Sequence, residues 1–174
     1  WFEEGEGPRL NGLIDGFNIA NLKPVSDIHE TLNPIYQTVN NLSKELPKST
    51  TLIGFAGAPW TVATYMVLGK GSKDHVEVKR FLNCYPETFD KLIQTLTEAT
   101  IEYLCAQIKA GAEVIKIFDS WAGVLSGLDM LKYSYKPLCK ITKEIKEQFP
   151  NIPVIVFPRG VGGGYELFSK VADF

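Results

Sequence analysis

Polar side chains that could take part in chemistry stand where a predicted strand ends. Asp119 and Ser120 close the apolar run AEVIKIFDS and precede the residues Trp-Ala-Gly. A carboxylate and a hydroxyl at this place can accept and donate hydrogen bonds to a polar ligand. A capping Asp and a turn Ser would produce the same pattern, so both interpretations stay open. No histidine is close to Ser120 in the sequence, and a Ser–His nucleophile is therefore not supported.

A second candidate is the stretch GFAGAPWTVATYM, in which an apolar strand runs into small residues and then a helix. Gly54 and Gly57 keep side-chain bulk away from the strand end, so the backbone can approach a ligand closely. Phe55 can present an aromatic face, and Tyr65 can reach back from the helix with its hydroxyl. Alternatively, the glycines form a tight turn, and Phe55, Trp60 and Tyr65 belong to the core.

The third candidate is the loop PRGVGGG, which follows the apolar run IPVIVF. Arg159 at the end of this strand can bind a carboxylate through two parallel hydrogen bonds, or it can be solvated. The glycines miss the G-x-G-x-x-G spacing of dinucleotide-binding loops, because Gly164 is followed by Tyr165. A small nucleotide-binding α/β protein nevertheless remains an alternative.

Apolar periodicity and Pro/Gly punctuation predict alternating strands and helices. A stripe at helical spacing covers residues 28–46, with Asn33 as the cap of a new start and Pro34 at its first position. The predicted strands are 50–57, 112–120 and 152–157; the other predicted helices start at Pro59, cover 74–84, run from Pro86 to Gly111, lie around 138–149 and start at Tyr165.

Strands that alternate with helices imply right-handed βαβ units and a buried parallel sheet. The fold is then either a small open α/β sheet or about three of the eight strands of a (β/α)8 barrel, which needs about 250 residues. The chain starts at Trp1 rather than Met. We therefore expect residues 1–174 to form a single incomplete domain of a longer protein.

Composition narrows the class of protein. The 174 residues are 45% hydrophobic and 22% charged, with a net charge of −2, so no overall field attracts nucleic acid. No apolar run approaches the roughly 18 residues of a membrane span. Cys84, Cys105 and Cys139 lie in apolar helical patterns, which favours buried free thiols in a reducing compartment over disulfides or zinc. The stretch KGSKDHVEVKR is expected to be solvated surface, and its lysines could rim an anion site.

Taken together, GFAGAPWTVATYM and IFDSWAG resemble the uroporphyrinogen decarboxylase family, as do EGEGPRL upstream and the strand PVIVF with its Gly-containing loop. The resemblance covers nearly the whole chain, with the motifs in the right order and at the right distances. It implies part of a (β/α)8 TIM barrel in a cytoplasmic homodimer. It also implies decarboxylation of the four acetate arms of uroporphyrinogen III to give coproporphyrinogen III, without metal or organic cofactor.

The resemblance also implies roles for particular residues. Tyr65 and Ser120 match active-site positions and are the expected catalytic residues. Phe55 matches an apolar residue packed against the tetrapyrrole, and Gly57 matches a nearby backbone position. Arg159 stands where a Lys is common in relatives and is expected to bind a substrate carboxylate.

Several family motifs are absent from this chain. They are the N-terminal Arg-Gln-Ala-Gly-Arg stretch, the Ser-Asp-Ile motif with the aspartate that faces the pyrrole nitrogens, and the C-terminal segment with its histidine. The role of that aspartate is not assigned to Asp27 in VSDIH. We therefore expect the chain to be inactive by itself.

Two alternatives differ in class from a cofactor-free decarboxylase. One is a zinc-dependent corrinoid methyltransferase that shares the barrel, for which a His/Cys ligand set would be needed. The other is a non-catalytic module that binds a tetrapyrrole and keeps the motifs only for packing.

Overall fold

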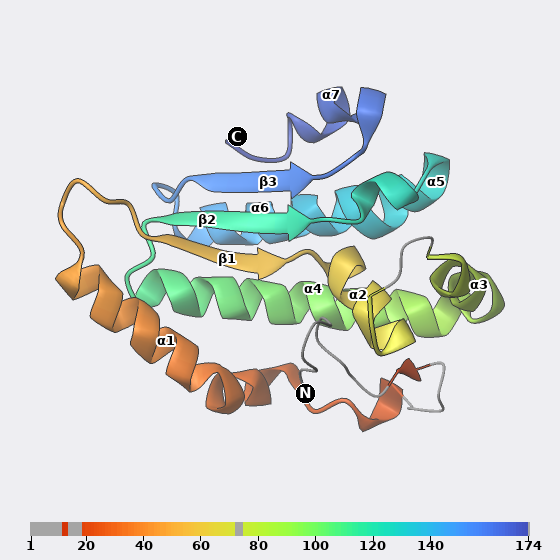
Figure 1. Cartoon of the computed structure of the whole chain (residues 1–174), viewed down its shortest axis with the longest axis horizontal. Helices are drawn as coiled ribbons and strands as arrows, with labels where there is room; N and C mark the ends of the chain where they lie inside the picture. Colours follow the sequence, from red (N-terminus) through yellow and green to blue (C-terminus); the bar gives the residue numbers. More distant parts are fainter. Residues whose placement is uncertain (1–11, 14–18, 72–74, 174) are drawn as a thin grey trace.

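Three parallel strands form the centre of the molecule. A computed structural model describes residues 12–13, 19–71 and 75–173. The strands β1 (Ile53–Gly57), β2 (Val114–Asp119) and β3 (Val154–Pro158) are adjacent in the order β1-β2-β3, with every pairing parallel. All three point the same way in Figure 1, so their carboxyl ends meet at one edge of the sheet. The predicted mixed α/β fold with a parallel sheet and flanking helices is confirmed.

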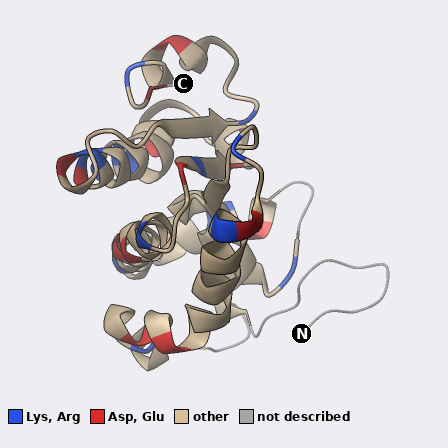
Figure 2. Ribbon diagram, turned by 90° about the vertical axis from the view of Figure 1, so that its left-hand side faces the viewer, with Lys and Arg blue, Asp and Glu red and all other residues tan. Residues whose placement is uncertain are grey.

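Helices separate the strands along the chain. The remaining elements are α1 (Ile28–Glu45), α2 (Pro59–Leu68), α3 (Val76–Cys84), α4 (Pro86–Lys109), α5 (Gly127–Met130), the π-helical segment η5 (Leu131–Tyr135), α6 (Lys136–Gln148) and α7 (Tyr165–Phe168), with short 3-10 turns between them. The helix predicted to start at Tyr165 is confirmed as α7, which ends at Phe168. Charged residues are mainly on the helices (Figure 2).

Pro34 does not restart a helix, contrary to the prediction. It lies inside the continuous helix α1, which begins at Ile28 without a side-chain cap. Pro34 has no N–H, so the carbonyl one turn earlier loses its intrahelical donor. The hydroxyl of Thr38 donates to the Pro34 carbonyl oxygen at 2.9 Å. Helix α1 packs on α4 through Val39, which is buried in the core, and this tertiary contact supports a continuous helix across Pro34.

The two faces of the sheet differ in burial. One face carries Ala56, Ile117 and Val156, which pack with apolar residues of α4 and α6. The opposite face, here called the open face, carries Phe55 and Phe157, which are 59% and 40% exposed. A second apolar cluster joins α2, α3 and α4 beyond the carboxyl ends of the strands. That cluster holds α2 in place beside the strand ends.

Two expectations about surface and thiols need correction. His75 is buried although its stretch was predicted to be solvated, because its ring packs 4.7 Å from that of Trp121. Cys105 is buried and Cys139 is half-buried, but Cys84 is exposed at the end of α3; all three are free thiols.

Among the described helices, none is both long and apolar enough to cross a membrane. Lys73, one of the lysines of the stretch KGSKDHVEVKR predicted to rim an anion site, lies outside the described residues.

Gln107 of α4 binds the backbone of β1. Its side-chain amide accepts from the Phe55 N–H at 3.1 Å and donates to the Phe55 carbonyl at 3.0 Å. A Cβ at Gly54 would lie 2.9 Å from the Gln107 Oε1 atom, so glycine is required for this contact. The predicted role of Gly54 in approaching a ligand is therefore wrong, because its bare side faces α4.

We predict that Gln107→Ala lowers the free energy of unfolding of the full-length protein by about 1–3 kcal/mol, because two hydrogen bonds to Phe55 are lost. Chemical denaturation measures this change. The matched control is Gln94→Ala on the same helix, where the side chain is exposed and bonds only to Glu98. A loss no larger than that of the control would contradict the role assigned to Gln107.

Candidate active site

A buried carboxylate joins the end of β2 to two helical segments. Asp119 is fully buried. Its Oδ1 atom accepts from the Thr61 hydroxyl of α2 at 2.7 Å, and its Oδ2 atom accepts from the Ser134 hydroxyl of η5 at 2.5 Å. The alternative that Asp119 caps a helix is wrong: its side chain cross-links three elements.

Further hydrogen bonds tie the start of α2 to the loop after β2. The Trp60 indole N–H donates to the Trp121 carbonyl at 2.9 Å, and the Trp121 N–H donates to the Thr61 hydroxyl at 3.3 Å. The Ala58 N–H donates to the Phe118 carbonyl at 2.9 Å. Trp60 itself is fully buried, so for this residue the core interpretation is right. The two stretches singled out in the sequence therefore form one rigid unit.

Burial raises the pKa of Asp119 from 3.8 to about 6, although the hydrogen bonds from Ser134 and Thr61 act in the opposite direction. Desolvation disfavours the charged carboxylate more than the two hydroxyl donors favour it. The proton is therefore bound more tightly in the folded protein than in the unfolded chain.

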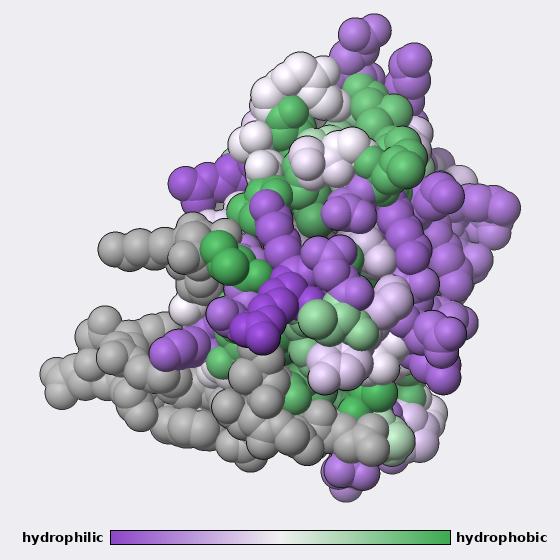
Figure 3. Space-filling view, turned by 90° about the vertical axis from the view of Figure 1, so that its right-hand side faces the viewer, coloured by the Kyte–Doolittle hydropathy of each residue, from purple (hydrophilic) through white to green (hydrophobic). Residues whose placement is uncertain are grey.

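Aromatic rings cover the open face at the carboxyl ends of the strands. Phe118 of β2 has edge-to-face contacts with Phe55 of β1 and Phe157 of β3, at centroid distances of 5.9 and 6.1 Å. Phe118 and Phe157 are partners in the strand register. The three rings make an apolar surface that we call the aromatic floor. Figure 3 views the molecule from this end of the sheet and shows hydrophobic and hydrophilic groups side by side.

The predicted site residues occupy this end of the sheet. Phe55 is in the aromatic floor, and Gly57 ends β1, where a Cβ would lie 3.0 Å from Val62 of α2. Ser120 directly follows β2 and is half-buried, whereas Arg159 directly follows β3 and is exposed. The structure thus brings Ser120 and Arg159 to adjacent strand ends, where the Arg159 N–H donates to the Asp119 carbonyl.

Tyr65 stands apart from this group. It lies on α2, one turn after Thr61, and is half-buried. Within the described part of the chain, no hydrogen bond or ring contact joins its side chain to Phe55, Ser120 or Arg159. A Cβ at Gly71 would lie 3.6 Å from its ring, so Tyr65 packs beside the segment that follows α2.

The loops after β2 and β3 touch through their glycines. A Cβ at Gly123 would lie 2.4 Å from the carbonyl oxygen of Gly160, and the Gly123 N–H donates to the Arg159 carbonyl at 2.9 Å. Only a glycine at 123 permits this approach. The Gly-rich loop therefore packs against its neighbour, and it leads into a helix of only four residues.

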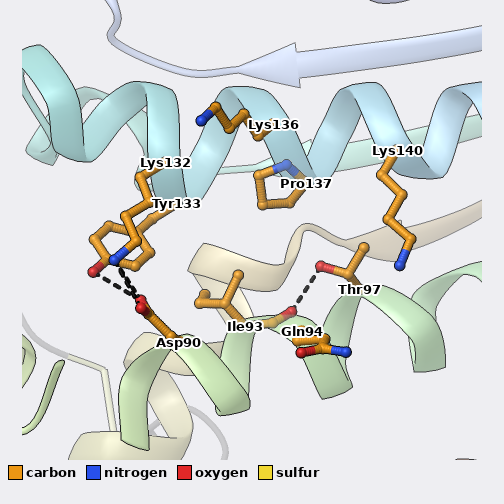
Figure 4. Close-up of a pocket in the computed structure, with 9 residues that line it drawn as sticks. All are labelled: Asp90, Ile93, Gln94, Thr97, Lys132, Tyr133, Lys136, Pro137 and Lys140. Atoms are coloured by element: carbon orange, nitrogen blue, oxygen red, sulfur yellow. Dashed lines mark hydrogen bonds and ion pairs between the residues drawn. The ribbon is translucent and has the colours of Figure 1, made fainter. Parts of the chain in front are cut away.

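Two grooves lie away from the strand ends. One, of about 250 Å³, lies between α4 and the η5–α6 segment, with Lys132, Lys136 and Lys140 on its wall (Figure 4). Lys132 is already paired with Asp90 at 2.7 Å. The other is a groove lined by residues of α1, α4 and α6. Neither groove includes the candidate residues.

Sequence reasoning missed the network around Asp119 and the phenylalanines that continue the aromatic floor. The polar partners Thr61 and Ser134 come from segments distant in sequence, and nothing in the chain pairs them in advance. Phe118 and Phe157 could have been found by the alternation of side chains along each strand, given the register.

Comparison with known proteins shows which family this chain belongs to. The model of the family described as uroporphyrinogen decarboxylase (URO-D) matches residues 1–173. The chain belongs to the uroporphyrinogen decarboxylase family. Proteins named uroporphyrinogen decarboxylase from Jannaschia sp. (strain CCS1) and Ruegeria pomeroyi are 55% and 56% identical to it over 170 residues, or 98% of the chain. Those alignments cover 50% and 49% of the relatives, so the chain spans about half the length of these members of the family.

A solved structure, that of a methyltransferase from Methanosarcina mazei, resembles this member of the uroporphyrinogen decarboxylase family with a TM-score of 0.63. The alignment covers 80% of this chain and 39% of the other, with 19% sequence identity. At this identity the likeness shows the fold alone, and it does not favour the methyltransferase alternative.

The described residues contain no group of three or more His, Cys, Asp or Glu side chains arranged to hold a metal ion. The chemistry that this part of the uroporphyrinogen decarboxylase fold offers comes from an apolar surface, hydroxyl groups and an arginine at the strand ends. Such groups can bind and orient an organic anion.

The raised pKa of Asp119 predicts a pH-dependent stability. Because the folded pKa of about 6 exceeds the ordinary value of 3.8, this carboxyl stabilises the fold most at low pH and loses that contribution as pH rises through about 6. Denaturation of the full-length protein at a series of pH values is expected to show the stability advantage of wild type over Asp119→Asn shrinking by about 2 kcal/mol between about pH 4 and about pH 7.

Asp129→Asn is the control for this measurement, since Asp129 is exposed in α5. The free energy of unfolding of this variant is expected to differ from that of wild type by less than about 0.5 kcal/mol, because the side chain is exposed. A difference between Asp119→Asn and wild type that does not change with pH would show that burial does not raise the pKa of Asp119.

Proposed function

We propose that the whole protein, of which this chain is part, is a cytoplasmic, homodimeric uroporphyrinogen decarboxylase that works without metal or organic cofactor. In this proposal the chain contributes three strands of a closed (β/α)8 barrel as one incomplete domain. Membership of the family supports the activity. The observation that carries the proposal is the aromatic floor, which is open to a ligand and adjoins Ser120 and Arg159 at the strand ends.

The aromatic floor suits the proposed substrate. Uroporphyrinogen is a wide tetrapyrrole macrocycle with eight carboxylate arms at its rim. The three phenylalanine rings, which contact one another edge-to-face, offer an apolar surface to the macrocycle. Polar groups around the floor can then meet the arms, and Arg159 has the planar fork that matches a carboxylate.

The reaction breaks the bond between the acetate methylene and its carboxyl carbon. The electron pair of that bond needs an acceptor, which a pyrrole ring provides once it has been protonated. CO2 then leaves without a free carbanion, and the methylene gains a proton to become a methyl group. The proton first added to the ring is lost, which restores the aromatic pyrrole, so one proton is taken up for each CO2 released. An enzyme accelerates this sequence by stabilising the cationic ring and by holding the departing carboxylate in position.

In this scheme, Ser120 and Tyr65 contribute hydrogen bonds from their hydroxyls to the reacting acetate region. Ser120 is fixed because it follows Asp119, whose carboxylate is bonded on both sides. Tyr65 is fixed because Thr61, one turn earlier on α2, is bonded to the same carboxylate. Asp119 therefore acts as a positioning residue. It sets the separation between the hydroxyls of Ser120 and Tyr65, neither of which bonds to its carboxylate.

The aspartate that faces the pyrrole nitrogens and the proton donor belong, by the family resemblance, to segments outside this chain. We predict that residues 1–174 alone do not convert uroporphyrinogen III, whereas the full-length protein does. A turnover assay on both, with product carboxyl number read by chromatography, tests this. Conversion by the 174-residue chain alone would show that those segments are dispensable.

Removing the two hydroxyls tests the site assignment. In the full-length protein, Tyr65→Phe and Ser120→Ala are each expected to lower kcat/KM about 10- to 100-fold, since a hydrogen bond to a charged group is lost. Steady-state kinetics with uroporphyrinogen III measures the change.

Tyr85→Phe and Ser126→Ala serve as matched controls, because both side chains are exposed and lie outside the strand ends. Their kcat/KM is expected to differ from wild type by less than about twofold. Unchanged turnover in Tyr65→Phe and Ser120→Ala would mean that these residues are not part of the active site.

The cofactor-free mechanism has its own test. Treating the full-length enzyme with a strong chelator and dialysing it is expected to leave uroporphyrinogen turnover unchanged, because no step in the scheme uses a metal. Stoichiometric zinc in the purified protein, together with lost activity after chelation, would instead support the zinc-dependent methyltransferase alternative. Tetrapyrrole binding without turnover would support the non-catalytic module.

A further inference from the structure

The open face of the sheet carries a cation among its aromatic rings. Lys116 alternates with the buried residues Ile115 and Ile117, so it lies on the same side of β2 as Phe118. In the register of the sheet it is directly beside Phe55. On the open face of the three described strands, Lys116 is the one charged residue.

The Lys116 side chain extends toward the carboxyl ends of the strands. Its Nζ atom lies 4.8 Å from the centroid of the Phe118 ring and 5.5 Å from that of the Phe157 ring. Phe118 follows Lys116 by two residues on the same face, and Phe157 is the register partner of Phe118. The ammonium group therefore lies beside residues that are two positions further along the strands than Lys116 itself, on the side of Ser120 and Arg159.

The rings hold this ammonium in place without neutralising it. A cation attracted to aromatic faces keeps its charge and its capacity to donate three hydrogen bonds. In the part of the chain that the structure describes, the ion pairs between side chains join other cations, namely His29, Lys132, Lys140, Lys143 and Lys146.

We propose that Lys116 binds a carboxylate arm of the tetrapyrrole whose rings lie on the aromatic floor. This inference rests on the proposed function and adds to it a charged contact from within the floor. An apolar surface with one embedded ammonium fits a ligand that has a wide apolar macrocycle and carboxylates at its rim. Lys116 anchors one arm from below, while Arg159 meets the rim from the end of the neighbouring strand.

Embedding the ammonium between rings also explains why a lysine suits this position. The long aliphatic stem lies along the open face, so only the tip is charged. Because neighbouring apolar groups and the macrocycle exclude water, the ion pair with a carboxylate is screened less than at the surface. The contact therefore contributes to binding rather than to the chemical step.

Kinetics of the full-length enzyme with uroporphyrinogen III test the inference. Lys116→Met, which keeps the length and loses the charge, is expected to raise KM about tenfold with kcat changed less than about twofold. Lys116→Arg is expected to restore KM to within about threefold of wild type. Lys136→Met, an exposed lysine of α6 at the distant groove, is the charge-matched control and is expected to leave KM unchanged.

Equilibrium binding of uroporphyrin, the oxidised form with the same eight carboxylates, separates this inference from the proposed function. If wild type binds uroporphyrin but turns over no uroporphyrinogen, the proposed activity is wrong. In that case, weaker uroporphyrin binding by Lys116→Met, with unchanged binding by Lys136→Met, would still support the contact between Lys116 and a carboxylate arm. If wild type is active and Lys116→Met keeps the wild-type KM and uroporphyrin affinity, the anchor is wrong. Equal losses in Lys116→Met and Lys116→Arg, together with a lowered melting temperature, would also overturn it in favour of a packing role.

Discussion

The buried carboxylate of Asp119 is the constraint on which the candidate site depends. It accepts hydrogen bonds from the Thr61 and Ser134 hydroxyls, and so fixes α2 and η5 relative to the end of β2. If either hydroxyl lost this acceptor, a buried polar group would lack a hydrogen-bond partner, which would lower the stability of the fold. The need to satisfy every partner therefore specifies one arrangement of these three elements. Tyr65 and Ser120 inherit their positions from it.

The same network restricts which residue types can stand in the stretches GFAGAPWTVATYM and IFDSWAG. Trp60 must fill the apolar cluster and donate to the Trp121 carbonyl, while Thr61 must both donate to Asp119 and accept from the Trp121 N–H. Each residue meets a packing demand and a hydrogen-bond demand at once. Few residue types at these positions satisfy both demands.

The sheet divides structural and functional demands between its two faces. Its buried face packs against α4 and α6 with aliphatic residues, as a parallel sheet in an α/β protein does. Its open face carries phenylalanines and Lys116, which no described helix covers. Alternation along the strands lets a single segment such as VIKIFD serve both faces.

Much of this organisation was predictable from the sequence. Apolar periodicity together with Pro and Gly punctuation predicted the three strands, their parallel arrangement and most helices, because these patterns reflect local geometry. The stretches GFAGAPWTVATYM and IFDSWAG predicted both the family and the end of the sheet where Phe55, Ser120 and Arg159 lie. Local rules failed at Pro34, since the packing of a helix on its neighbours can outweigh the preferences of its own residues.

Other features were decided only by the tertiary structure. The bare side of Gly54 faces Gln107 rather than a ligand, and Asp119 bonds to Thr61 and Ser134 rather than capping a helix. These contacts join residues that are far apart along the chain, so neither residue spacing nor residue type predicts them. The sequence by itself determined the elements, the family and the residue types at the strand ends. The fold decided which side chains meet, because hydrogen-bond partners and ring contacts depend on the register of the strands and on how helices pack across them.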